Sequence, residues 1–252
     1  AMADAKHAFG RSRGASGGKE GGAAIIYDLQ YDYHSQRFAV TSADSRIRVY
    51  EKGGNGDHVE VAEIEVEGRA RKLAWAPPHF GQVLAAMVDN KSVRIYEESV
   101  STGGDGGVGF KLCAELATRS TPTGVYFKPG AEPSLSLTLA VPCEDGKVLI
   151  FSAGDSMNLS DWKLTSEFEA GKSACSAVSW NPNYLDIPSM VAACGKEANI
   201  WEYYSEQHRW VKACEIKHQH ASQINCVAWA PAMGRSFQLI ATASDAMRIF
   251  RL

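Results

Sequence analysis

The chain has 252 residues and 45% hydrophobic content, enough to bury a sizeable core, and all-β chains of this length often form one domain. Its 26 basic and 29 acidic side chains leave a formal net charge of −3, which argues against direct binding of nucleic acid. No apolar run of about 18 residues occurs, so we expect no membrane insertion, and the polar start lacks the apolar stretch of a signal peptide.

The first 23 residues are rich in glycine, serine and charge, a composition typical of a disordered tail. Ala1 in front of Met2 has the look of a cloning remnant. Within the tail, the stretch GASGGKE resembles a phosphate-binding loop. It lacks the required glycine spacing, and Glu20 stands where a serine or threonine would bind magnesium. We therefore expect no phosphate site there.

From residue 24 onward, one pattern repeats. A strand-like segment with an apolar residue two places before an aromatic one occurs five times, at intervals of 44 to 53 residues. The five pairs are Leu29/Tyr31, Leu73/Trp75, Val125/Phe127, Val178/Trp180 and Val227/Trp229. Four of them are followed by x-Pro, at Pro77, Pro129, Pro182 and Pro231. Each strand is therefore predicted to end in a turn.

Each unit continues with further strands in a fixed order. A small-residue strand follows, then in four units an aspartate that could accept N–H groups of a tight turn: Asp44, Asp89, Asp145 and Asp245. A third strand alternates apolar residues before an aromatic one: Ile47/Val49/Tyr50, Val93/Ile95/Tyr96, Val148/Ile150/Phe151, Ala198/Ile200/Trp201 and Met247/Ile249/Phe250. A fourth carries glutamate directly before an apolar residue: Glu63/Ile64, Glu115/Leu116, Glu167/Phe168 and Glu215/Ile216.

Four short strands per unit, repeated at this period, predict an all-β fold, a β-propeller. We expect blades at about 24–67, 68–117, 118–170 and 171–217, and an incomplete one at 218–252, which makes about four and a half blades. Each blade must be covered by its neighbours. An open, incomplete propeller leaves two flanks exposed, so we expect stability only with a partner or by self-association.

Signals for cofactor or metal chemistry are weak. Residues 104–109 match G-x-G-x-x-G, but no helix is predicted to follow, and that fingerprint works only at a helix N-terminus. His218 and His220 could face one metal, yet no third ligand is evident. We interpret His220, four residues before Ile224, as a brace of the turn between blades. No nucleophile motif occurs. We expect no catalytic residue, no cofactor and no metal, and hence no enzyme.

Two further residue types have structural interpretations. Six cysteines without a C-x-x-C pair are interpreted as buried free thiols: Cys113, Cys143, Cys175, Cys194, Cys214 and Cys226. Arginines recur on the third strands: Arg46, Arg48, Arg94 and Arg248. They alternate with apolar residues, which favours a solvated or blade-bracing face. A basic rim for phosphopeptides or acidic partners is the alternative.

Three stretches of the sequence are not common to WD-repeat proteins in general: FGQVLA, MNLS-x-W and APxxGRSF. Through them, and in order from about residue 24 to 252, the chain resembles the Seh nucleoporin family, WD-repeat proteins related to the Sec-thirteen coat protein. The resemblance implies an open propeller that a helical scaffold nucleoporin completes by inserting a blade in trans. It also implies a non-enzymatic scaffold role in the Y-shaped coat of the nuclear pore, at the nuclear envelope, with the other subunits of that coat as partners.

The family is also associated with a nutrient-sensing assembly that regulates TOR kinase at lysosomal or vacuolar membranes. The resemblance places the donated blade beside the first blade, so Ile25, Ile26, Tyr27 and Leu29 are candidate partner contacts. The alternative is that they are blade core. A Sec-thirteen-type vesicle coat subunit, or a peptide-reading WD-repeat adaptor with aromatic and basic side chains at the blade tops, stays open as another function.

This chain departs from the family pattern in two respects. It ends before the family's sixth blade, so the chain is cut short, the gene product is short, or the partner supplies more than usual. The WD dipeptide is also degenerate, with Tyr50, Tyr96, Phe151 and Phe250 in place of tryptophan. We therefore expect the His-Ser-Asp-Trp bracing network to be mostly absent.

Overall fold

The structure, a computed structural model, describes residues 25–89, 91–100, 107–130, 136–155, 158–183, 186–216, 220–231 and 233–252. The predicted tail at 1–23, its phosphate-loop-like stretch, residues 104–106 of the glycine motif and His218 lie outside these ranges. Within them are nineteen strands, two short 3-10 helices, η1 (Pro78–Phe80) and η2 (Ser205–Gln207), and no α-helix. None of the helices in these ranges is long and apolar enough to cross a membrane.

The strands form five small antiparallel sheets, each an uninterrupted meander for its part of the chain. The first is β1 (Ile26–Tyr31), β2 (Arg37–Ser42), β3 (Arg46–Lys52) and β4 (His58–Glu65). The second is β5 (Ala70–Trp75), β6 (Val83–Val88), β7 (Ser92–Val100) and β8 (Val108–Ala117). The third is β9 (Tyr126–Phe127), β10 (Thr138–Pro142), β11 (Lys147–Asp155) and β12 (Asn158–Glu169).

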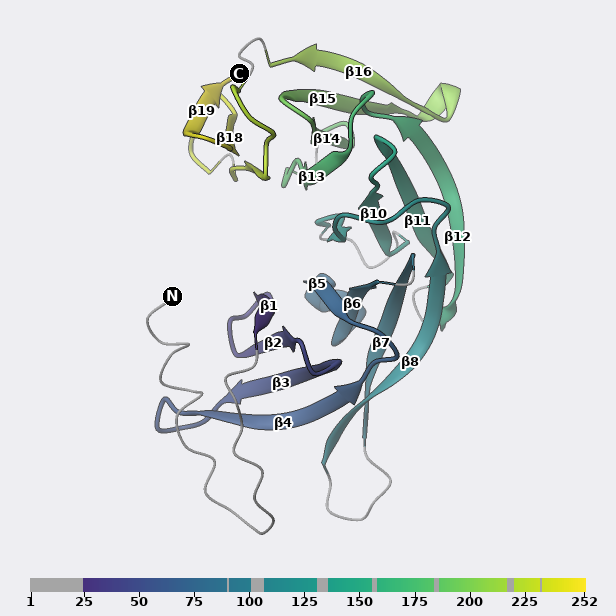
Figure 1. Ribbon diagram of the computed structural model, residues 1–252, viewed down its shortest axis with the longest axis vertical. Helices are drawn as coiled ribbons and strands as arrows, with labels where there is room; N and C mark the ends of the chain where they lie inside the picture. Colours follow the sequence, from purple (N-terminus) through teal and green to yellow (C-terminus); the bar gives the residue numbers. More distant parts are fainter. Residues whose placement is uncertain are drawn as a thin grey trace.

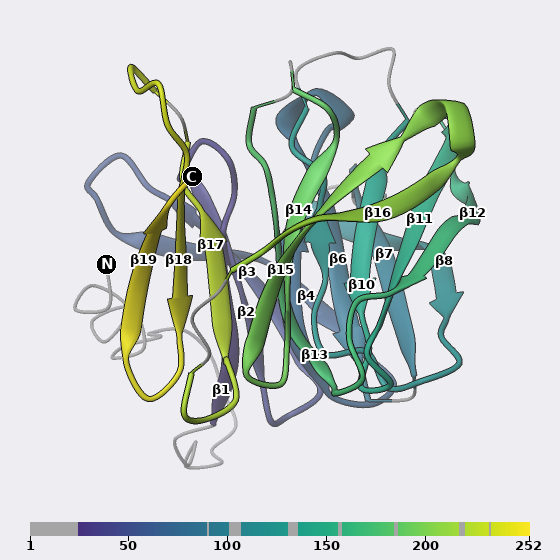
Figure 2. The ribbon, with the colours of Figure 1, turned by 90° about the horizontal axis from the view of Figure 1, so that it is seen from above.

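The fourth sheet has the same form, and the fifth is shorter by one strand. The fourth is β13 (Cys175–Trp180), β14 (Ser189–Cys194), β15 (Glu197–Tyr204) and β16 (Arg209–Glu215). The fifth is β17 (Cys226–Trp229), β18 (Leu239–Ala243) and β19 (Met247–Arg251), so that β19 is its outer edge (Figure 2). The sheets follow one another around an arc that stays open between the first and the fifth (Figure 1). The predicted open, incomplete β-propeller is thereby confirmed.

Side chains that alternate along each strand give every sheet two faces. We call the face that packs on the preceding sheet the backward face and the one that packs on the following sheet the forward face. At the first junction, Val49 on the forward face of the first sheet belongs to one buried cluster with Leu73 and Leu84 of the second. At the last junction, Ile200 packs in the same way with Ile240. Burial of these apolar side chains between sheets is what holds the arc together.

The inner strands of neighbouring sheets are also joined by hydrogen bonds. Leu73 N–H donates to a carboxylate oxygen of Asp28 at 2.9 Å, and the indole N–H of Trp75 donates to the Gln30 carbonyl at 3.0 Å. The strand-end tryptophan of the fourth sheet repeats this contact, since Trp180 Nε1 donates to the Tyr126 carbonyl at 2.9 Å. The recurring aromatic residue of the sequence therefore belongs to the backward face and holds the preceding sheet.

The predicted role of the turn aspartates is right for Asp145, which accepts the N–H of Lys147 at 3.2 Å. The carboxylates of the other three bind basic side chains: Arg48 for Asp44, Arg71 for Asp89 and His220 for Asp245. A turn at the end of a sheet brings the carboxylate next to a neighbouring strand. The third-strand arginines Arg48 and Arg94 are accordingly blade-bracing residues, paired with Glu63 and Glu115 of the outer strands.

All six cysteines are free, but the prediction that they are buried holds for only three of them. Cys143, Cys175 and Cys194 are buried, whereas Cys113 is half-buried and Cys214 and Cys226 are exposed. Cys214 lies on the outer strand β16. Cys226 lies on the inner strand of the fifth sheet, on a face that no following sheet covers. Its exposure is therefore a property of the open arc and not of the local sequence.

His220 acts as a brace, as predicted from its position before Ile224. Its Nε2 lies 2.7 Å from the Thr242 hydroxyl and its Nδ1 lies 3.3 Å from the Asp245 carboxylate, and its side chain is almost fully buried. Its backbone N–H donates to the carbonyl of Lys196 in the fourth sheet at 3.2 Å. The fifth sheet thus has a His-Thr-Asp network that fixes its position on the fourth.

Candidate functional site

None of the other described sheets packs on the forward face of the fifth sheet. In the first four sheets, the two apolar residues of the third strand are between 0% and 5% exposed: Ile47, Val49, Val93, Ile95, Val148, Ile150, Ala198 and Ile200. At the same two positions of the fifth sheet, Met247 is 72% exposed and Ile249 is 61% exposed. The sequence places core residues there, so the surface has the composition of a junction between sheets without the neighbouring sheet.

The rest of that face is apolar as well. Ala228 on β17 is exposed, and Ala241 on β18 is half-buried between it and Ile249 in the strand order. β19 carries no fourth strand on its outer side among the described residues, so one edge of the sheet is also available. An open edge beside an apolar face can accept a strand and the side chains of a foreign segment together.

The backward face of the first sheet is the second surface on which no described sheet packs, although its own side chains leave Phe38 only 3% and Val40 only 2% exposed. Its centre is a row of aromatic residues across three strands, Tyr31, Phe38 and Tyr50, with ring centroids 5.4 and 5.0 Å apart. Tyr31 stands where Trp75 and Trp180 stand in other sheets, but no preceding sheet of the described chain receives it, and 38% of it is exposed. Burial, together with the nearby carboxylate of Glu60, raises the pKa of Tyr50 to about 12.

Charged groups occupy the next row of the same face. Arg48 lies 2.5 Å from the Asp44 carboxylate and 3.1 Å from both the Glu63 carboxylate and the Ser42 hydroxyl. Partial burial opposes ionisation of Asp44, but hydrogen bonds from Arg48 and Ser42 outweigh it and lower the pKa of that carboxyl. Beside the aromatic row, the face therefore offers fixed polar groups to whatever covers it.

The four predicted partner contacts do not share one face. Ile25 is 66% exposed and Ile26 is 42% exposed at the start of β1. Leu29 is half-buried on the backward face, opposite Val40. Tyr27 lies at a register shift in β1 and turns to the second sheet, where the Arg71 guanidinium is 5.6 Å from its ring centroid. Sequence reasoning missed Tyr31, Met247 and Ile249, although they are the repeat residues of the first and last units.

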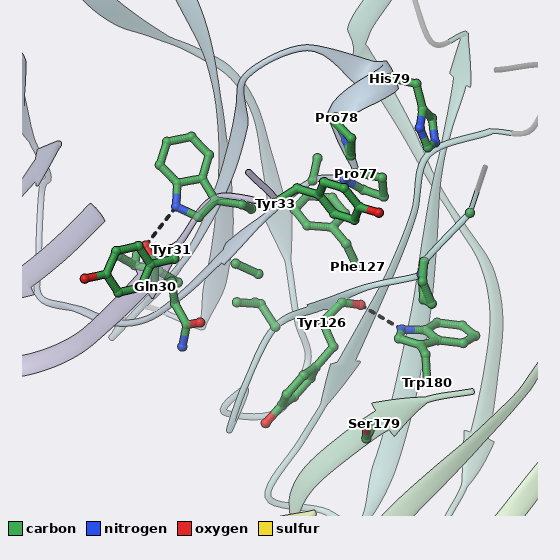
Figure 3. A pocket seen from close by; sticks show the side chains of 17 residues that line it. Gln30, Tyr31, Tyr33, Pro77, Pro78, His79, Tyr126, Phe127, Ser179 and Trp180 are labelled. Carbon is green, nitrogen blue, oxygen red and sulfur yellow. Dashed lines mark hydrogen bonds between the residues drawn. The ribbon is translucent and has the colours of Figure 1, made fainter. Parts of the chain in front are cut away.

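A pocket of about 590 Å³ lies at the inner strands of the first four sheets (Figure 3). Aromatic residues and prolines make up most of its wall: Tyr31, Tyr33, Trp75, Tyr126, Phe127, Trp180, Pro77, Pro78 and Pro129. The indole N–H groups of Trp75 and Trp180 are already bonded to carbonyls of Gln30 and Tyr126, shown by dashed lines in Figure 3. Among the described residues that line it, the imidazole of His79 is the one basic side chain. The aromatic part expected for a peptide-reading adaptor is present, and the lysines and arginines are not.

No group of three or more His, Cys, Asp or Glu side chains suited to a metal ion occurs in the part of the chain that the structure describes. The buried histidine of this part, His220, has both ring nitrogens engaged in the fifth sheet. What the described surface offers is therefore apolar sheet faces, an open edge and an aromatic pocket, all suited to binding other polypeptide chains.

Comparison with known proteins gives a consistent set of relatives. No family model matches the sequence. The chain is 34% identical over 242 residues to Nucleoporin SEH1 of Danio rerio, 33% to Nucleoporin SEH1 of Xenopus tropicalis and 33% to Nucleoporin SEH1 of Homo sapiens. Each alignment covers 90% of this chain and 65% or 66% of the relative. The chain therefore spans just under two thirds of the length of these relatives.

Proposed function

The chain belongs to the Seh nucleoporin family, and from this premise we propose that it is a non-enzymatic scaffold subunit of the nuclear pore coat, located at the nuclear envelope. Its partner is a helical scaffold nucleoporin that completes the propeller by placing its own strands beside the first sheet. Further contacts with other subunits of the Y-shaped coat follow from that position.

The proposal rests on the backward face of the first sheet, on which no described sheet packs and beside which Tyr31, Ile25 and Ile26 are exposed. Every other backward face in the arc packs on a preceding sheet and donates hydrogen bonds to it or packs with it in a buried cluster. A segment laid beside β1 would cover Tyr31 and bury Ile25 and Ile26. Burying exposed apolar area contributes roughly 25 cal/mol per Å² before the costs of association.

A strand is a better occupant of this site than a helix. The free side of β1, like that of the inner strand of every sheet, presents backbone N–H and C=O groups at the spacing of a sheet edge, and beside the first sheet a strand can satisfy them while its side chains reach the aromatic row. The acidic and basic groups around Arg48 then fix the register, because a misaligned charge would be buried without its partner.

The proposal is tested by calorimetric titration of the chain with the helical scaffold nucleoporin of the same organism. The change Ile25→Asp with Ile26→Asp should weaken binding at least tenfold, because two carboxylates would be buried against the donated segment. Val59→Asp is the matched control, since Val59 is 58% exposed on the outer strand of the same sheet. Equal affinity of the double variant and the wild-type chain, with both folded, would rule out this face.

The variant Tyr27→Asp with Leu29→Asp separates the two neighbouring positions. Leu29 is on the backward face and Tyr27 packs against Arg71 of the second sheet, so we expect Leu29→Asp alone to account for any loss of affinity. If Tyr27→Asp rather than Leu29→Asp lowers the affinity, the partner would instead contact the junction between the first and second sheets. Thermal unfolding of each variant controls for damage to the sheet.

A second role, in a TOR-regulating complex at the lysosomal or vacuolar surface, uses the same open face in this proposal. Which helical protein copurifies with the chain separates the two assemblies. Copurification of vesicle coat cage proteins alone would instead assign the chain to the Sec-thirteen type. In both cases we still expect the partner to bind at the first sheet.

A further inference from the structure

A second hollow, of about 690 Å³, lies between the third and fourth sheets. We call it the interblade groove. One wall comes from the third sheet and carries Lys128, Thr138, Ile150, Ser152, Thr165 and Ser166; the other comes from the fourth sheet and η2 and carries Trp180, Ile187, Pro188, Tyr203, Tyr204, Ser205, Glu206 and Trp210. It shares Trp180 with the central pocket but otherwise has a separate wall.

The corresponding place at the first junction is filled. There Arg37, the Cα partner of Glu51, binds both Glu51 and Glu98 of the second sheet at 2.9 Å. The pair Arg37/Glu51 is the row directly beyond Phe38/Tyr50. In the third sheet the row beyond Leu139/Phe151 is Thr138/Ser152, two small hydroxyl residues. The groove therefore has two short hydroxyl side chains at the position where the first junction has a long, ion-paired arginine.

The polar wall of the groove carries hydroxyl groups that are already engaged within the third sheet, since the Thr138 hydroxyl donates to the Ser136 carbonyl at 3.2 Å and the Thr165 hydroxyl to the Ile150 carbonyl at 3.1 Å. The hydroxyls of Thr138 and Ser152 are 3.1 Å apart, and those of Ser152 and Thr165 are 3.3 Å apart. Lys128 is half-buried beside them, and no carboxylate of the described residues forms an ion pair with its amine. Burial lowers the pKa of the Lys128 amine, because the charged form loses water without gaining a partner. An oxyanion would supply that partner.

The opposite wall is aromatic and aliphatic. The Trp210 ring lies 5.8 Å from that of Trp180 and 5.4 Å from that of Tyr203, so the three form one continuous surface. Ile187 extends it to the rim and is 55% exposed. Glu206 is exposed on η2 at the same rim, and its negative charge disfavours a ligand with several adjacent anionic groups. One anionic group beside one large apolar group matches the two walls.

We propose that the interblade groove binds a short extended peptide segment of a partner protein in which an acidic residue stands next to an aromatic or large aliphatic one. The carboxylate meets the Lys128 amine, and the apolar side chain lies against Trp180, Tyr203 and Trp210. Charge complementarity with an unpaired, desolvated ammonium selects this occupant. The proposal is independent of the open faces and of the partner that covers them.

The experiment uses a phage-displayed library of random octapeptides selected on the full chain. We expect a consensus with Asp or Glu next to Phe, Trp, Leu or Ile. The consensus peptide is then synthesised, and its affinity is measured by fluorescence polarisation. Lys128→Gln should weaken binding at least tenfold, and exchanging Asp for Asn in the peptide should have no further effect on that variant. Lys111→Gln, an exposed lysine of β8, is the matched control and should leave the affinity unchanged.

A second variant tests the groove without removing its charge. Thr138→Arg with Ser152→Glu places in the third sheet the pair that fills the first junction, and it should abolish peptide binding while the thermal unfolding transition is retained. Selection without an acidic and apolar consensus would overturn the proposal. So would a consensus peptide whose affinity is the same on the wild-type chain and on both variants.

Discussion

Junctions between sheets and the two ends of the arc are built from the same residues and differ only in what lies next to them. At the second junction, Val93 and Ile95 are fully buried; at the free end, Met247 and Ile249 occupy the same positions and are mostly exposed. The strand-end aromatics show the same contrast, since Trp180 is bonded to the preceding sheet and Tyr31 has no such sheet. The repeat therefore places apolar residues on both faces of every sheet, and a face is buried only where another sheet lies next to it.

The largest difference is expected between the strand-end aromatics. Trp180→Ala removes a buried ring and the indole hydrogen bond to Tyr126, and should lower the free energy of unfolding by about 3–5 kcal/mol. Tyr31→Ala loses a half-exposed ring that packs on Phe38, and should cost about 1 kcal/mol. Urea unfolding of the two variants measures both values. Similar losses would mean that the first sheet is covered in the isolated chain.

The third-strand residues give the next largest difference. Ile95→Ala should cost about 2–5 kcal/mol because it leaves a cavity in the second junction. Ile249→Ala should cost less than about 0.5 kcal/mol because its side chain is already in water. The same unfolding experiment compares them. If Ile249→Ala were as damaging as Ile95→Ala, the fifth sheet would have a covered forward face.

At high protein concentration, the exposed forward face of the fifth sheet should cause the chain to self-associate. Exposed apolar surface of this kind favours contacts between copies, so sedimentation of the wild-type chain should depend on concentration. Met247→Lys with Ile249→Lys should weaken the association at least tenfold by placing two charges on that face. Val59→Lys, on the outer strand of the first sheet, serves as the control and should behave as the wild-type chain does. Identical sedimentation of the wild-type chain, the double variant and the control would show that copies do not associate through the forward face of the fifth sheet.

The smallest effect is expected from the charged row of the first sheet. Hydrogen bonds from Arg48 and Ser42 lower the pKa of Asp44 below that of the unfolded chain, so Asp44 adds stability above the unfolded pKa of about 3.9. That contribution is lost as the pH falls through the folded pKa. Asp44→Asn should therefore be less stable than the wild-type chain at pH 7, and the two urea midpoints should converge as the pH falls below the lowered folded pKa of Asp44. A constant difference between them would exclude the ion pair as the cause.

The periodic features of the sequence were sufficient to predict the sheets. Apolar residues two places before a strand-end aromatic identified all five inner strands, and alternation identified the third strands, because both patterns follow from the two-residue period of a strand. His220 was predictable for a similar reason, since its distance from Ile224 places it at the start of a unit. Alternation along a strand and position within a repeat unit depend on the local sequence alone, so both can be predicted without knowing the neighbouring sheets.

Properties that depend on a neighbouring sheet were not predictable. The turn aspartates look alike in sequence, yet Asp89 binds Arg71 of another strand and Asp145 binds only its own turn. Cys226 resembles the buried cysteines and is exposed because no sheet follows its own. The interblade groove depends on the register that sets Thr138 against Ser152 beside Lys128, which no single strand reveals.

Hydrogen–deuterium exchange of the chain alone and with the helical scaffold nucleoporin tests the central claim most directly. The amides of β1 and β19 should exchange fast in the free chain, in contrast to those of β7 and β11, which are paired with a strand on each side. On addition of the partner, β1 should become protected while β7 and β11 stay as they were. Equal protection of β1 with and without the partner would contradict an open propeller that is completed from outside.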